Sequence, residues 1–358
     1  MEKLKVIAYY LPQFHRLKFN DDYWGKGFTE WTNTAKAKPL FKGHYQPHVP
    51  ADLGFYDLTV PSVRKEQADL AKRYGIDGFC YWHYWFGKDK PMMERPFNEV
   101  VDSGEPNFPF CLAWANHDWH DLKTKEVTIK QEYDGESDYY SHFKALEKSF
   151  HDKRYMRIDG RPIFVIFSPF GLPNPKEFFN HWNKYAEESG LNSFYFIGIV
   201  KNDSDGLKAL ELGYDGINTI RLHEFENNRS FLGRHLNAFY RRYFNKPFTY
   251  PFEKAMKYFW SALDEKKNVF PTIISGWDHT PRSGKNGLVL TGYTPKLFGR
   301  YVRNIFSKKR QTSETETENI IFIRAWNEWA EGNHLEPDLK YGLQFLEELK
   351  GAKEEFSK

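Results

Sequence analysis

The sequence has few cysteines and no long apolar segment. Its two cysteines, Cys80 and Cys111, both lie within apolar runs, so they provide neither the disulfide framework of a small secreted domain nor a metal-ligand spacing. The first ten residues lead directly into a predicted strand, without the apolar segment and cleavage site of a signal peptide. No stretch of 18 or more apolar residues occurs. We therefore expect a cytoplasmic protein with no membrane insertion.

An excess of charge of one sign is also lacking. The chain has 51 basic and 48 acidic residues and a net charge of +3, which gives no electrostatic reason to expect a nucleic acid or another polyanion as partner. A doubly wound nucleotide-binding fold would need a glycine-rich turn after the first predicted strand. The segment Leu11-Pro-Gln-Phe-His15 stands there instead. We expect no nucleic-acid partner and no cofactor.

Aromatic residues, in contrast, are abundant. They make up 18% of the chain, with 11 Trp, 22 Tyr and 32 Phe. A core rich in aromatic side chains accounts for many of them, but several tryptophans stand beside polar residues at the ends of predicted strands. This combination favours a cleft for a carbohydrate, because indole rings stack on the apolar faces of sugars.

Apolar runs of strand length alternate with helix-like segments along the chain. This alternation predicts an α/β protein with a parallel sheet and crossover helices, and eight strands close most simply into one (β/α)8 (TIM) barrel. With no internal repeat and no linker rich in Pro or Gly, we expect a single catalytic domain over residues 1–358. The predicted strands are residues 5–11, 76–82, 108–114, 162–167, 194–200, 213–220, 269–275 and 319–325. The predicted helices are residues 61–74, 137–150, 175–189, 204–212, 236–263, 295–308 and 341–356.

Two segments fall outside this alternation. Residues 14–61 have little periodicity but many aromatic and polar side chains. A segment of that length inside a compact domain usually has a function, so we expect it to fold over the mouth of the barrel. Residues 308–318 are charged and of low complexity, which predicts a mobile surface loop.

The stretch from Asn319 to Pro337 is where we expect the site. It begins as an apolar strand and continues into a polar and aromatic cluster, and in parallel α/β proteins ligands bind at such strand ends. Glu328 and Glu331 would point to opposite faces of a continuing strand, so both serve one site only if the strand stops near Glu328 and the chain turns, which Gly332 facilitates. Paired carboxylates in an aromatic cleft indicate acid/base chemistry on a sugar. The alternative is a salt-bridged surface loop.

Other predicted strand ends carry polar and aromatic groups together. A closed barrel would bring these ends to one face. Taken singly each has a structural alternative, and His83 alone is better explained as a core histidine bonded to a backbone carbonyl. Together, the residues that we expect to bind substrate are Tyr10, His15, Trp24, Glu30, Trp31, His44, Tyr81, His83, Trp85, Trp114, Asn116, His117, Trp277, Asp278, Arg282, Trp326, Asn327 and His334.

Two groups of residues resemble metal-binding sequences. The segment His117-Asp-Trp-His-Asp121 contains possible ligands, but no His-Glu-x-x-His or similar motif supports it, and we predict no metal site. Asp203-Ser-Asp205 matches the Asp-x-Asp motif with which many glycosyltransferases hold a metal-bound sugar nucleotide. This triplet also follows a predicted strand and precedes a helical pattern, so an acidic or serine N-cap explains it fully.

Several motifs distributed over nearly the whole chain carry a family resemblance. They are residues 8–15 (AYYLPQFH), 24–33 (WGKGFTEWTN), 38–47 (KPLFKGHYQP), 74–79 (YGIDGF), 83–85 (HYW), 114–116 (WAN), 277–278 (WD) and 326–332 (WNEWAEG). With these motifs the sequence resembles the WbsX-type proteins, described as glycosyltransferases of surface-polysaccharide clusters, which are similar to glycoside hydrolase family 99, the endo-α-mannosidase family. The likeness to the hydrolases is more distant and depends mainly on the last of these motifs and on the barrel.

The resemblance to the hydrolase family implies a mechanism without a covalent enzyme intermediate. One carboxylate helps the 2-hydroxyl of the substrate to attack its own anomeric carbon, which gives a 1,2-anhydro sugar, while the other protonates the leaving oxygen and later activates water. Carried over, Glu328 is the base on the 2-hydroxyl and Glu331 is the general acid/base. That role requires a raised pKa for Glu331, which we expect apolar walls such as Trp329 to provide.

The sequence departs from the commoner WbsX pattern at two places. After Trp114-Ala-Asn116 it has His-Asp-Trp-His-Asp where members more often have Glu-Asn-Trp followed by Thr and Arg, and His279 stands where Asn is usual. These positions are expected to contact substrate, so the sugar is not fixed by the resemblance.

Three functions are compatible with these observations. The first is a glycoside hydrolase that cleaves an α-linked, mannoside-like glycan or polysaccharide, favoured by the glutamate pair. The alternative is a glycosyltransferase in lipopolysaccharide O-antigen or capsular polysaccharide biosynthesis, favoured by the family description and the expected cytoplasmic location. A carbohydrate-binding module without catalysis would not require the glutamate pair. The sugar, the linkage, endo or exo action and the oligomeric state stay open.

Overall fold

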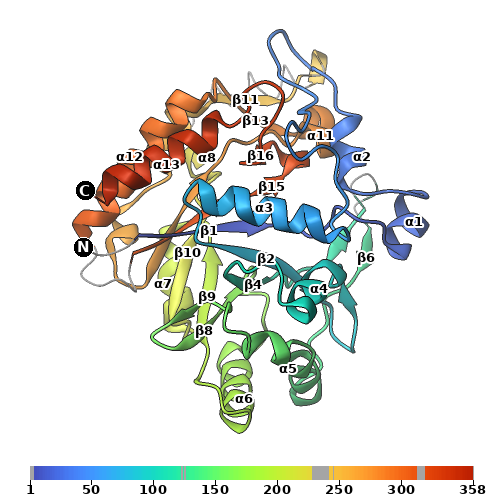
Figure 1. Ribbon diagram of the computed structural model, residues 1–358, viewed down its shortest axis with the longest axis vertical. Coiled ribbons are helices and arrows are strands. Elements are labelled where there is room, and N and C mark those ends of the chain that lie inside the picture. Colours follow the sequence, from blue (N-terminus) through green and yellow to red (C-terminus); the bar gives the residue numbers. More distant parts are fainter. Residues whose placement is uncertain are drawn as a thin grey trace.

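Eight parallel strands close into a barrel. The computed structural model describes residues 4–121, 124, 126–227, 242–244, 246–312 and 319–357. Neighbouring strands follow the order β1-β14-β12-β10-β9-β8-β4-β2, and β2 pairs again with β1, which closes the sheet (Figure 1). These strands are β1 (Lys5–Tyr10), β2 (Gly78–Trp85), β4 (Phe110–Trp114), β8 (Arg161–Ile166), β9 (Tyr195–Val200), β10 (Gly216–Thr219), β12 (Val269–Ile274) and β14 (Ile320–Arg324). The predicted barrel and its eight strands are confirmed.

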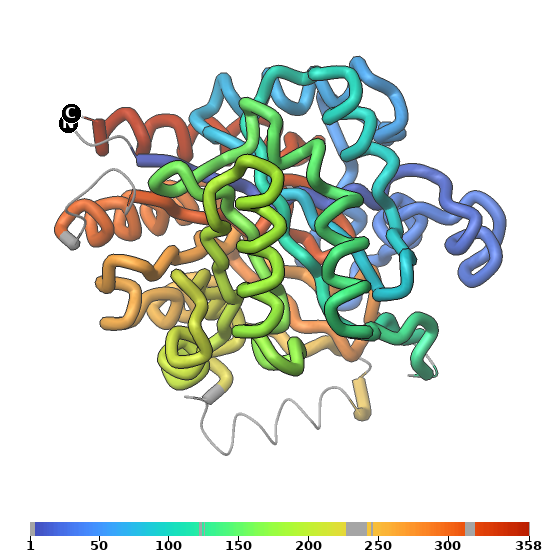
Figure 2. The backbone as a smooth tube through the Cα atoms, turned by 90° about the horizontal axis from the view of Figure 1, so that it is seen from below, coloured from blue at the N-terminus to red at the C-terminus, as the bar shows by residue number. Residues whose placement is uncertain are grey.

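Helices surround the barrel and cover its outer face. Figure 2, which views the molecule from below, shows α5 (Glu136–Phe150) and α6 (Pro175–Glu188) side by side. Phe143 of α5 meets Trp182 of α6 with 5.9 Å between ring centroids. α12 and α13 lie together on another side (Figure 1). Six of the predicted helices are confirmed within a few residues: α3 (Pro61–Arg73), α5 (Glu136–Phe150), α6 (Pro175–Glu188), α7 (Asp203–Glu211), α12 (Pro295–Thr312) and α13 (Gln344–Phe356). The sequence analysis did not predict α4 (Arg95–Ser103).

Two of the sequence-based expectations fail. The helix predicted over residues 236–263 falls partly outside the described residues, and its described part contains β11 (Phe248–Pro251), α10 (Phe252–Ala255) and two 3-10 turns, η1 (Met256–Tyr258) and η2 (Ala262–Glu265). Pro247 and Pro251 explain this difference, because proline lacks the amide hydrogen that a continuous helix needs. The loop predicted over residues 308–318 is helical up to Thr312, where α12 ends, and its remainder lies outside the described residues.

Side chains along each strand of the barrel alternate in direction. One points into the barrel and the next points outward against the surrounding helices. Tyr9 of β1 points inward, where its ring stacks on Trp82 of β2 at 4.8 Å and its hydroxyl donates to Asn218 of β10 at 2.7 Å. Tyr10, the next residue, points outward and donates to Gln67 of α3 at 2.7 Å. This alternation with period two decides which side chains of each strand are able to reach a ligand at the mouth.

The segment between β1 and α3 folds over the carboxyl end of the barrel, as predicted. It contains α1 (Lys18–Trp24) and α2 (Glu30–Ala35), and Figure 1 shows α2 beside β15, β16 and α11. Short additional elements complete the described chain: β3 (Pro91–Met92), β5 (Trp119–His120), β6 (Val127–Ile129), β7 (Arg157–Ile158), α8 (Glu224–Asn227), α11 (Thr280–Ser283), η3 (Gly284–Asn286), β13 (Leu288–Thr291), β15 (Asn327–Glu328), η4 (Trp329–Glu331) and β16 (Asn333–His334). Within the described ranges, no helix has both the length and the apolar character needed to cross a membrane.

Candidate active site

The chain turns sharply after β14 and brings two glutamates to one place. β15 ends at Glu328, and the short 3-10 helix η4 ends at Glu331. Gly332 then adopts a left-handed conformation with φ of 61°. An added Cβ on Gly332 would lie 2.7 Å from Cβ of Asp278, so a close approach of two segments also favours glycine here. The turn predicted from the sequence is confirmed.

The side chain of Asn327 fixes the start of this turn. Its Oδ1 accepts from the backbone N–H of Leu11 at 2.7 Å, and its Nδ2 donates to the carbonyl of the same residue at 3.0 Å. Since Leu11 follows β1, these two bonds clamp the segment after β14 to the end of the neighbouring strand. Asn327 therefore positions Glu328 but is itself buried and fully engaged with the backbone.

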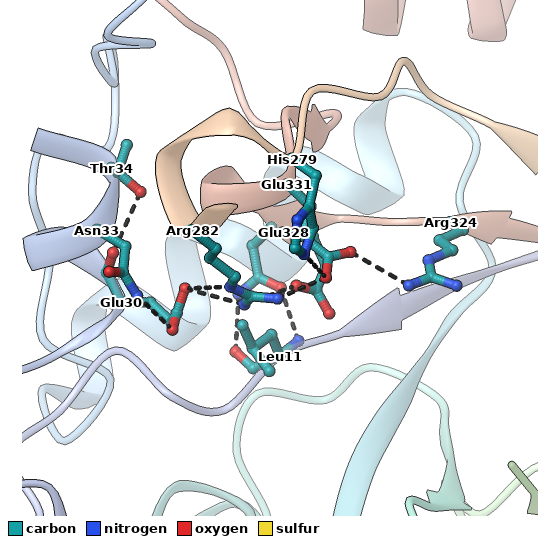
Figure 3. Close-up of polar contacts among 10 residues, drawn as sticks. Leu11, Glu30, Asn33, Thr34, His279, Arg282, Arg324, Glu328 and Glu331 are labelled. Atoms are coloured by element: carbon teal, nitrogen blue, oxygen red, sulfur yellow. Dashed lines mark hydrogen bonds and ion pairs between the residues drawn. The ribbon is translucent and has the colours of Figure 1, made fainter. Parts of the chain in front are cut away.

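One arginine bridges the three acidic groups at the mouth (Figure 3). Nη1 of Arg282 on α11 lies 2.5 Å from Oε1 of Glu331, and Nη2 lies 3.4 Å from Oε2 of Glu328. The other side of the guanidinium faces Glu30 of α2, with Nη2 donating to Oε2 at 2.9 Å. Both glutamates of the pair are buried. The Arg282 cation therefore partly balances a concentration of negative charge that burial would otherwise make costly.

A second arginine contacts only one member of the pair. Nη2 of Arg324, the last residue of β14, donates to Oε2 of Glu331 at 3.1 Å, and Nε2 of His279 lies 3.8 Å from Oε1 of the same carboxylate. The guanidinium of Arg324 also lies 5.1 Å from the ring centroid of Trp277. Glu331 is thus in contact with two arginines, whereas Glu328 is in contact with Arg282 alone, at the longer distance of 3.4 Å.

This difference in surroundings gives the two carboxyl groups different pKa values. Burial, followed by the negative charge of Glu331, raises the pKa of Glu328 to about 7. Burial acts in the same direction on Glu331, but Arg282 and Arg324 override it and lower its pKa to about 2. Between these two pKa values the pair therefore carries one proton, which sits mainly on Glu328 and is lost as the pH rises through about 7.

The expectation that Trp329 raises the pKa of Glu331 is wrong. The indole of Trp329 lies on the ring of His334 at 3.7 Å, and its Nε1 donates to the carboxylate of Glu336 at 2.6 Å. Trp329 therefore packs on the far side of the turn, and the two arginines, rather than an apolar wall, dominate the environment of Glu331.

The segment between β1 and α3 (residues 11–60), here called the covering segment, makes a second buried contact beside the pair. Backbone N–H of Leu40 donates to Nδ1 of His44, so the ring proton is on Nε2, which donates to Oδ2 of Asp278 at 2.6 Å. Gln46 donates to the same oxygen at 2.7 Å. Burial tends to raise the pKa of Asp278, but the bond from His44 and further bonds lower it overall. The backbone N–H of Asp278 donates to the carbonyl of Glu331 at 2.7 Å, which joins this contact to the glutamate turn.

A cavity of about 350 Å³ opens next to the glutamate turn. Asp278 and Gly332 form part of its wall, so it adjoins the pair, although neither glutamate lines it. Four of the predicted substrate-binding residues do line it: His44, Trp277, Asp278 and His334. Arg282 contacts the pair directly, Glu30 is bonded to Arg282, and Trp31 packs against Trp329 at 5.5 Å.

Six predicted substrate-binding residues lie on the outer face of the barrel, so their assignment is wrong. His83 bonds to His142 of α5 at 2.8 Å, and Trp85 stacks on the same imidazole at 4.8 Å. Trp114 stacks on Phe178 of α6 at 5.6 Å. For the five residues that belong to strands the cause is the register, because each is odd where the inward positions of its strand are even, or the reverse. Trp326 lies beyond the end of β14, where the alternation no longer applies, and its ring packs on Phe79 at 5.4 Å. The six residues are Tyr10, Tyr81, His83, Trp85, Trp114 and Trp326.

Four further predicted residues make their described contacts with groups other than the glutamate pair. Asn116 exchanges bonds with the backbone of Ser168, accepting from its N–H at 2.7 Å and donating to its carbonyl at 2.9 Å. His15 is buried beside the charges of Asp57 and Arg95. Trp24 packs on Phe28 at the end of α1, and His117 is exposed with its ring 5.1 Å from Phe167.

Two residues at the site were missed. The sequence analysis treats Arg324 only as part of an apolar strand. A cation at the end of a buried strand indicates that negatively charged side chains lie nearby. Tyr84 is the inward neighbour of His83 and Trp85, and its pKa is raised by burial and then by the charge of Glu328. Correct assignment of the inward register of β2 would have identified it.

Comparisons with known proteins agree with this architecture. The model of the family described as "Glycosyltransferase WbsX" matches residues 6–349. Two proteins from strains of Xanthomonas campestris pv. campestris, both described as "Uncharacterized protein WxcX", are 32% identical over 97% of this chain. The chain spans about half the length of these relatives, 49% in each case.

Solved structures share the fold at low sequence identity. The GH99 endo-alpha-mannosidase from Bacteroides thetaiotaomicron aligns over 98% of this chain and 97% of its own, with 14% identity and a TM-score of 0.56. A "Glycoside hydrolase-like protein" aligns over 98% of this chain and 94% of its own, also with 14% identity and with a TM-score of 0.60. Likeness at this identity concerns the fold.

Proposed function

The chain belongs to the family described as Glycosyltransferase WbsX, and from that premise we propose that it is a carbohydrate-active enzyme that cleaves an α-linked, mannoside-like glycan. The observation that carries this proposal is the buried pair of Glu328 and Glu331, held by one arginine and separated in pKa at the carboxyl end of the barrel. One protonated and one charged carboxyl are the two forms that acid/base cleavage of a glycosidic bond consumes.

The cleavage that we propose needs no covalent bond to the enzyme. One carboxylate removes the proton of the substrate 2-hydroxyl, whose oxygen attacks the anomeric carbon while the other carboxyl gives its proton to the departing oxygen. A 1,2-anhydro sugar results. In the second half, water attacks the anomeric carbon and gives a proton to the carboxylate that acted as acid, and the first carboxyl returns its proton to O2. Each residue ends in its starting form.

The assignment of the two roles follows from different observations. The resemblance to the hydrolase family gives the base role to Glu328 and the acid role to Glu331. The ion pairs of the site favour the reverse, with the proton on Glu328, as long as Arg282 contacts Glu331. A substrate hydroxyl that displaced Arg282 from Glu331 would raise the pKa of Glu331 and restore the order that the family resemblance implies.

Glycosyl transfer is the second candidate, because the family description names it. The Asp-x-Asp motif that would hold a sugar nucleotide does not favour it. Oδ1 of Asp203 lies 2.6 Å from Nη1 of Arg221 and accepts from Ser261 at 2.8 Å, while the side chain of Asn202 caps α7 by accepting from the N–H of Asp205. The motif is therefore used to begin a helix and to anchor Arg221.

The test compares the two reactions directly. The protein is incubated with α-mannans, with release of reducing ends as the readout, and separately with sugar nucleotides and an acceptor, with release of nucleotide as the readout. Glu328→Gln and Glu331→Gln should each reduce glycan cleavage by at least about 100-fold, while Glu253→Gln, an exposed glutamate paired with Arg300, should not. Nucleotide release that depends on Glu328, without glycan cleavage, would show transfer instead.

An activated leaving group separates the two roles. A dinitrophenyl α-mannoside needs no proton on its leaving oxygen, so the variant that lacks the acid should still form product from it. The variant that lacks the base should not. Retention of this activity in Glu331→Gln supports the roles implied by the family resemblance, whereas retention in Glu328→Gln supports the roles implied by the ion pairs.

A further inference from the structure

Three potential metal ligands, none of them a member of the glutamate pair, meet at one wall of the 350 Å³ cavity. Nδ1 of His48 lies 2.8 Å from Nε2 of His334, and a carboxylate oxygen of Asp338 completes a group whose ligand atoms all lie within 4.8 Å of one another. His48 belongs to the covering segment, and the other two follow the glutamate turn. In the part of the chain that the structure describes, no other three His, Cys, Asp or Glu side chains gather this closely.

The tautomer of His334 leaves a nitrogen lone pair at the centre of this group. Its Nδ1 lies 2.9 Å from the carbonyl oxygen of Glu336, which accepts only, so the ring proton is on Nδ1 and Nε2 is unprotonated. Stacking on Trp329 at 3.7 Å holds the ring in this orientation. A histidine whose second nitrogen donates to a backbone carbonyl is the usual arrangement behind a metal ligand.

The other two groups are also held in place. Oδ1 of Asp338 accepts from the backbone N–H groups of Lys340 and Tyr341 at 2.9 and 2.7 Å, which orients the carboxylate. The ring of His48 stacks on Tyr45 at 4.4 Å, with an angle of 22° between the planes. The ammonium of Lys340 lies over the rings of Tyr45 and Tyr341, at 4.4 and 4.7 Å from their centroids, so a nearby cation is present but engaged by aromatic faces.

We propose that His48, His334 and Asp338 bind a divalent first-row transition-metal ion, with Zn²⁺ as the ion of reference. Two imidazole nitrogens and one carboxylate oxygen suit ions of borderline softness, and three protein ligands leave one position of a tetrahedral ion open. All three residues line the cavity, so the open position is accessible to water or to an oxygen atom of a ligand that enters there. Without an ion, the two imidazole rings are joined by a hydrogen bond, in which one proton lies between Nδ1 of His48 and Nε2 of His334.

Adjustment on metal binding is small in this geometry. Ligand atoms of a tetrahedral Zn²⁺ site are about 3.4 Å apart, given metal–ligand distances of about 2.1 Å. His48 and His334 must therefore separate by a few tenths of an ångström, and Asp338 must move closer. His48 is half-buried and lies in the loop between α2 and α3, so it can make this movement without disturbing the sheet.

This proposal departs from the expectation of no metal site. No sequence motif announces it, because His48 and His334 are 286 positions apart in the chain. It is also independent of the proposed glycan cleavage, since neither Glu328 nor Glu331 takes part in it.

Metal content of the whole chain tests the proposal. The protein is treated with a chelator, equilibrated with Zn²⁺, passed through a gel-filtration column and analysed for zinc per chain. We expect one equivalent in the wild type and in the matched control His151→Ala, which removes an exposed histidine at the end of α5. His48→Ala and Asp338→Asn should each weaken Zn²⁺ binding at least about tenfold.

Cobalt provides a readout that does not depend on stoichiometry alone. Co²⁺ bound by two imidazoles and a carboxylate in a four- or five-coordinate site absorbs visible light much more strongly than aqueous Co²⁺, and this absorption should disappear in His48→Ala. Far-ultraviolet circular dichroism verifies that each variant is folded, and His48→Gln replaces His48→Ala if the latter is not. Zinc contents and Co²⁺ spectra that are the same in the wild type and in folded His48 and Asp338 variants would overturn the proposal, as would a wild type that retains no ion.

Discussion

Nη1 of Arg282 lies 2.5 Å from Oε1 of Glu331, and the same guanidinium reaches Glu328 and Glu30. One cation therefore holds three buried carboxylates that come from α2, β15 and η4. The relationship links the covering segment to the turn after β14, and it decides which glutamate carries a proton. Two predictions test its electrostatics without reference to any substrate.

Replacing Arg282 by Gln should destabilise the protein, and more strongly at alkaline than at acidic pH. Without the cation, the three carboxylates repel one another and their pKa values rise, so the folded variant gains stability as protons bind below the raised pKa values. The expected loss is about 3 kcal/mol of unfolding free energy at pH 8 and clearly less at pH 5. Urea unfolding at the two pH values measures the difference.

Arg300→Gln is the matched control for this variant. Arg300 pairs with Glu253 at 2.5 Å, but both side chains are more than half exposed, so solvent screens the pair. Its removal should change the unfolding free energy little at either pH. An Arg282→Gln variant that behaved like this control would mean that the three carboxylates are not held together in solution.

Replacing Glu328 by Gln should have the opposite effect and stabilise the protein at pH 8. The pKa of Glu328 rises from 4.5 to about 7 on folding, so its contribution to stability is fully present below pH 4.5 and is lost as the pH rises through about 7. A neutral amide does not carry this penalty. The gain is at most about 3 kcal/mol at pH 8 and vanishes near pH 4.5. Thermal unfolding across this pH range measures it, with the exposed Glu253→Gln as the reference that should show no such pH dependence.

Tyr84 and Tyr81 provide a test of the register of β2. Tyr84 points into the barrel, where burial and then the charge of Glu328 raise its pKa, whereas Tyr81 packs outward against Phe97 at 5.3 Å. Tyr84→Phe should lower kcat/KM about tenfold on a glycan that is found to be cleaved, because it removes a hydroxyl donor from the inner face of β2. Tyr81→Phe should leave kcat/KM unchanged. Equal effects of the two variants would contradict the assigned faces of the strand.

Alanine substitutions at Gly332 and Gly104 distinguish the cost of backbone strain from the cost of a steric contact. Both have positive φ, 61° and 74°, but an added Cβ meets Asp278 at Gly332 and nothing within 4 Å at Gly104. Gly104→Ala should cost about 1 kcal/mol of unfolding free energy from conformation alone. Gly332→Ala should cost about 3 kcal/mol, because the contact adds to the strain. Similar losses in the two variants would mean that the turn and Asp278 are less closely packed than described.

The sequence by itself determined the barrel and the location of its glutamate pair. Eight apolar runs separated by helical patterns specify eight strands, because burial on both faces and crossover connections leave few other arrangements. The step from an apolar strand to Glu328, Glu331 and Gly332 is local, so the turn was predictable as well. Pro247 and Pro251 are also local signals, and they predict an interruption of a helix over residues 236–263.

Only the tertiary structure decided what surrounds that pair. The two-residue period of a strand shows that neighbouring side chains face opposite ways, but it does not show which of them faces inward. For this reason the sequence analysis assigned Tyr81, His83 and Trp85 to the site instead of Tyr84. Arg282, Glu30 and Glu331, like His48 and His334, come from distant parts of the chain, and their contacts depend on how the covering segment docks on the barrel. Because a pKa is set by the charges and burial around a group, its direction for Glu331 was fixed by that docking and not by the residues beside it in the sequence.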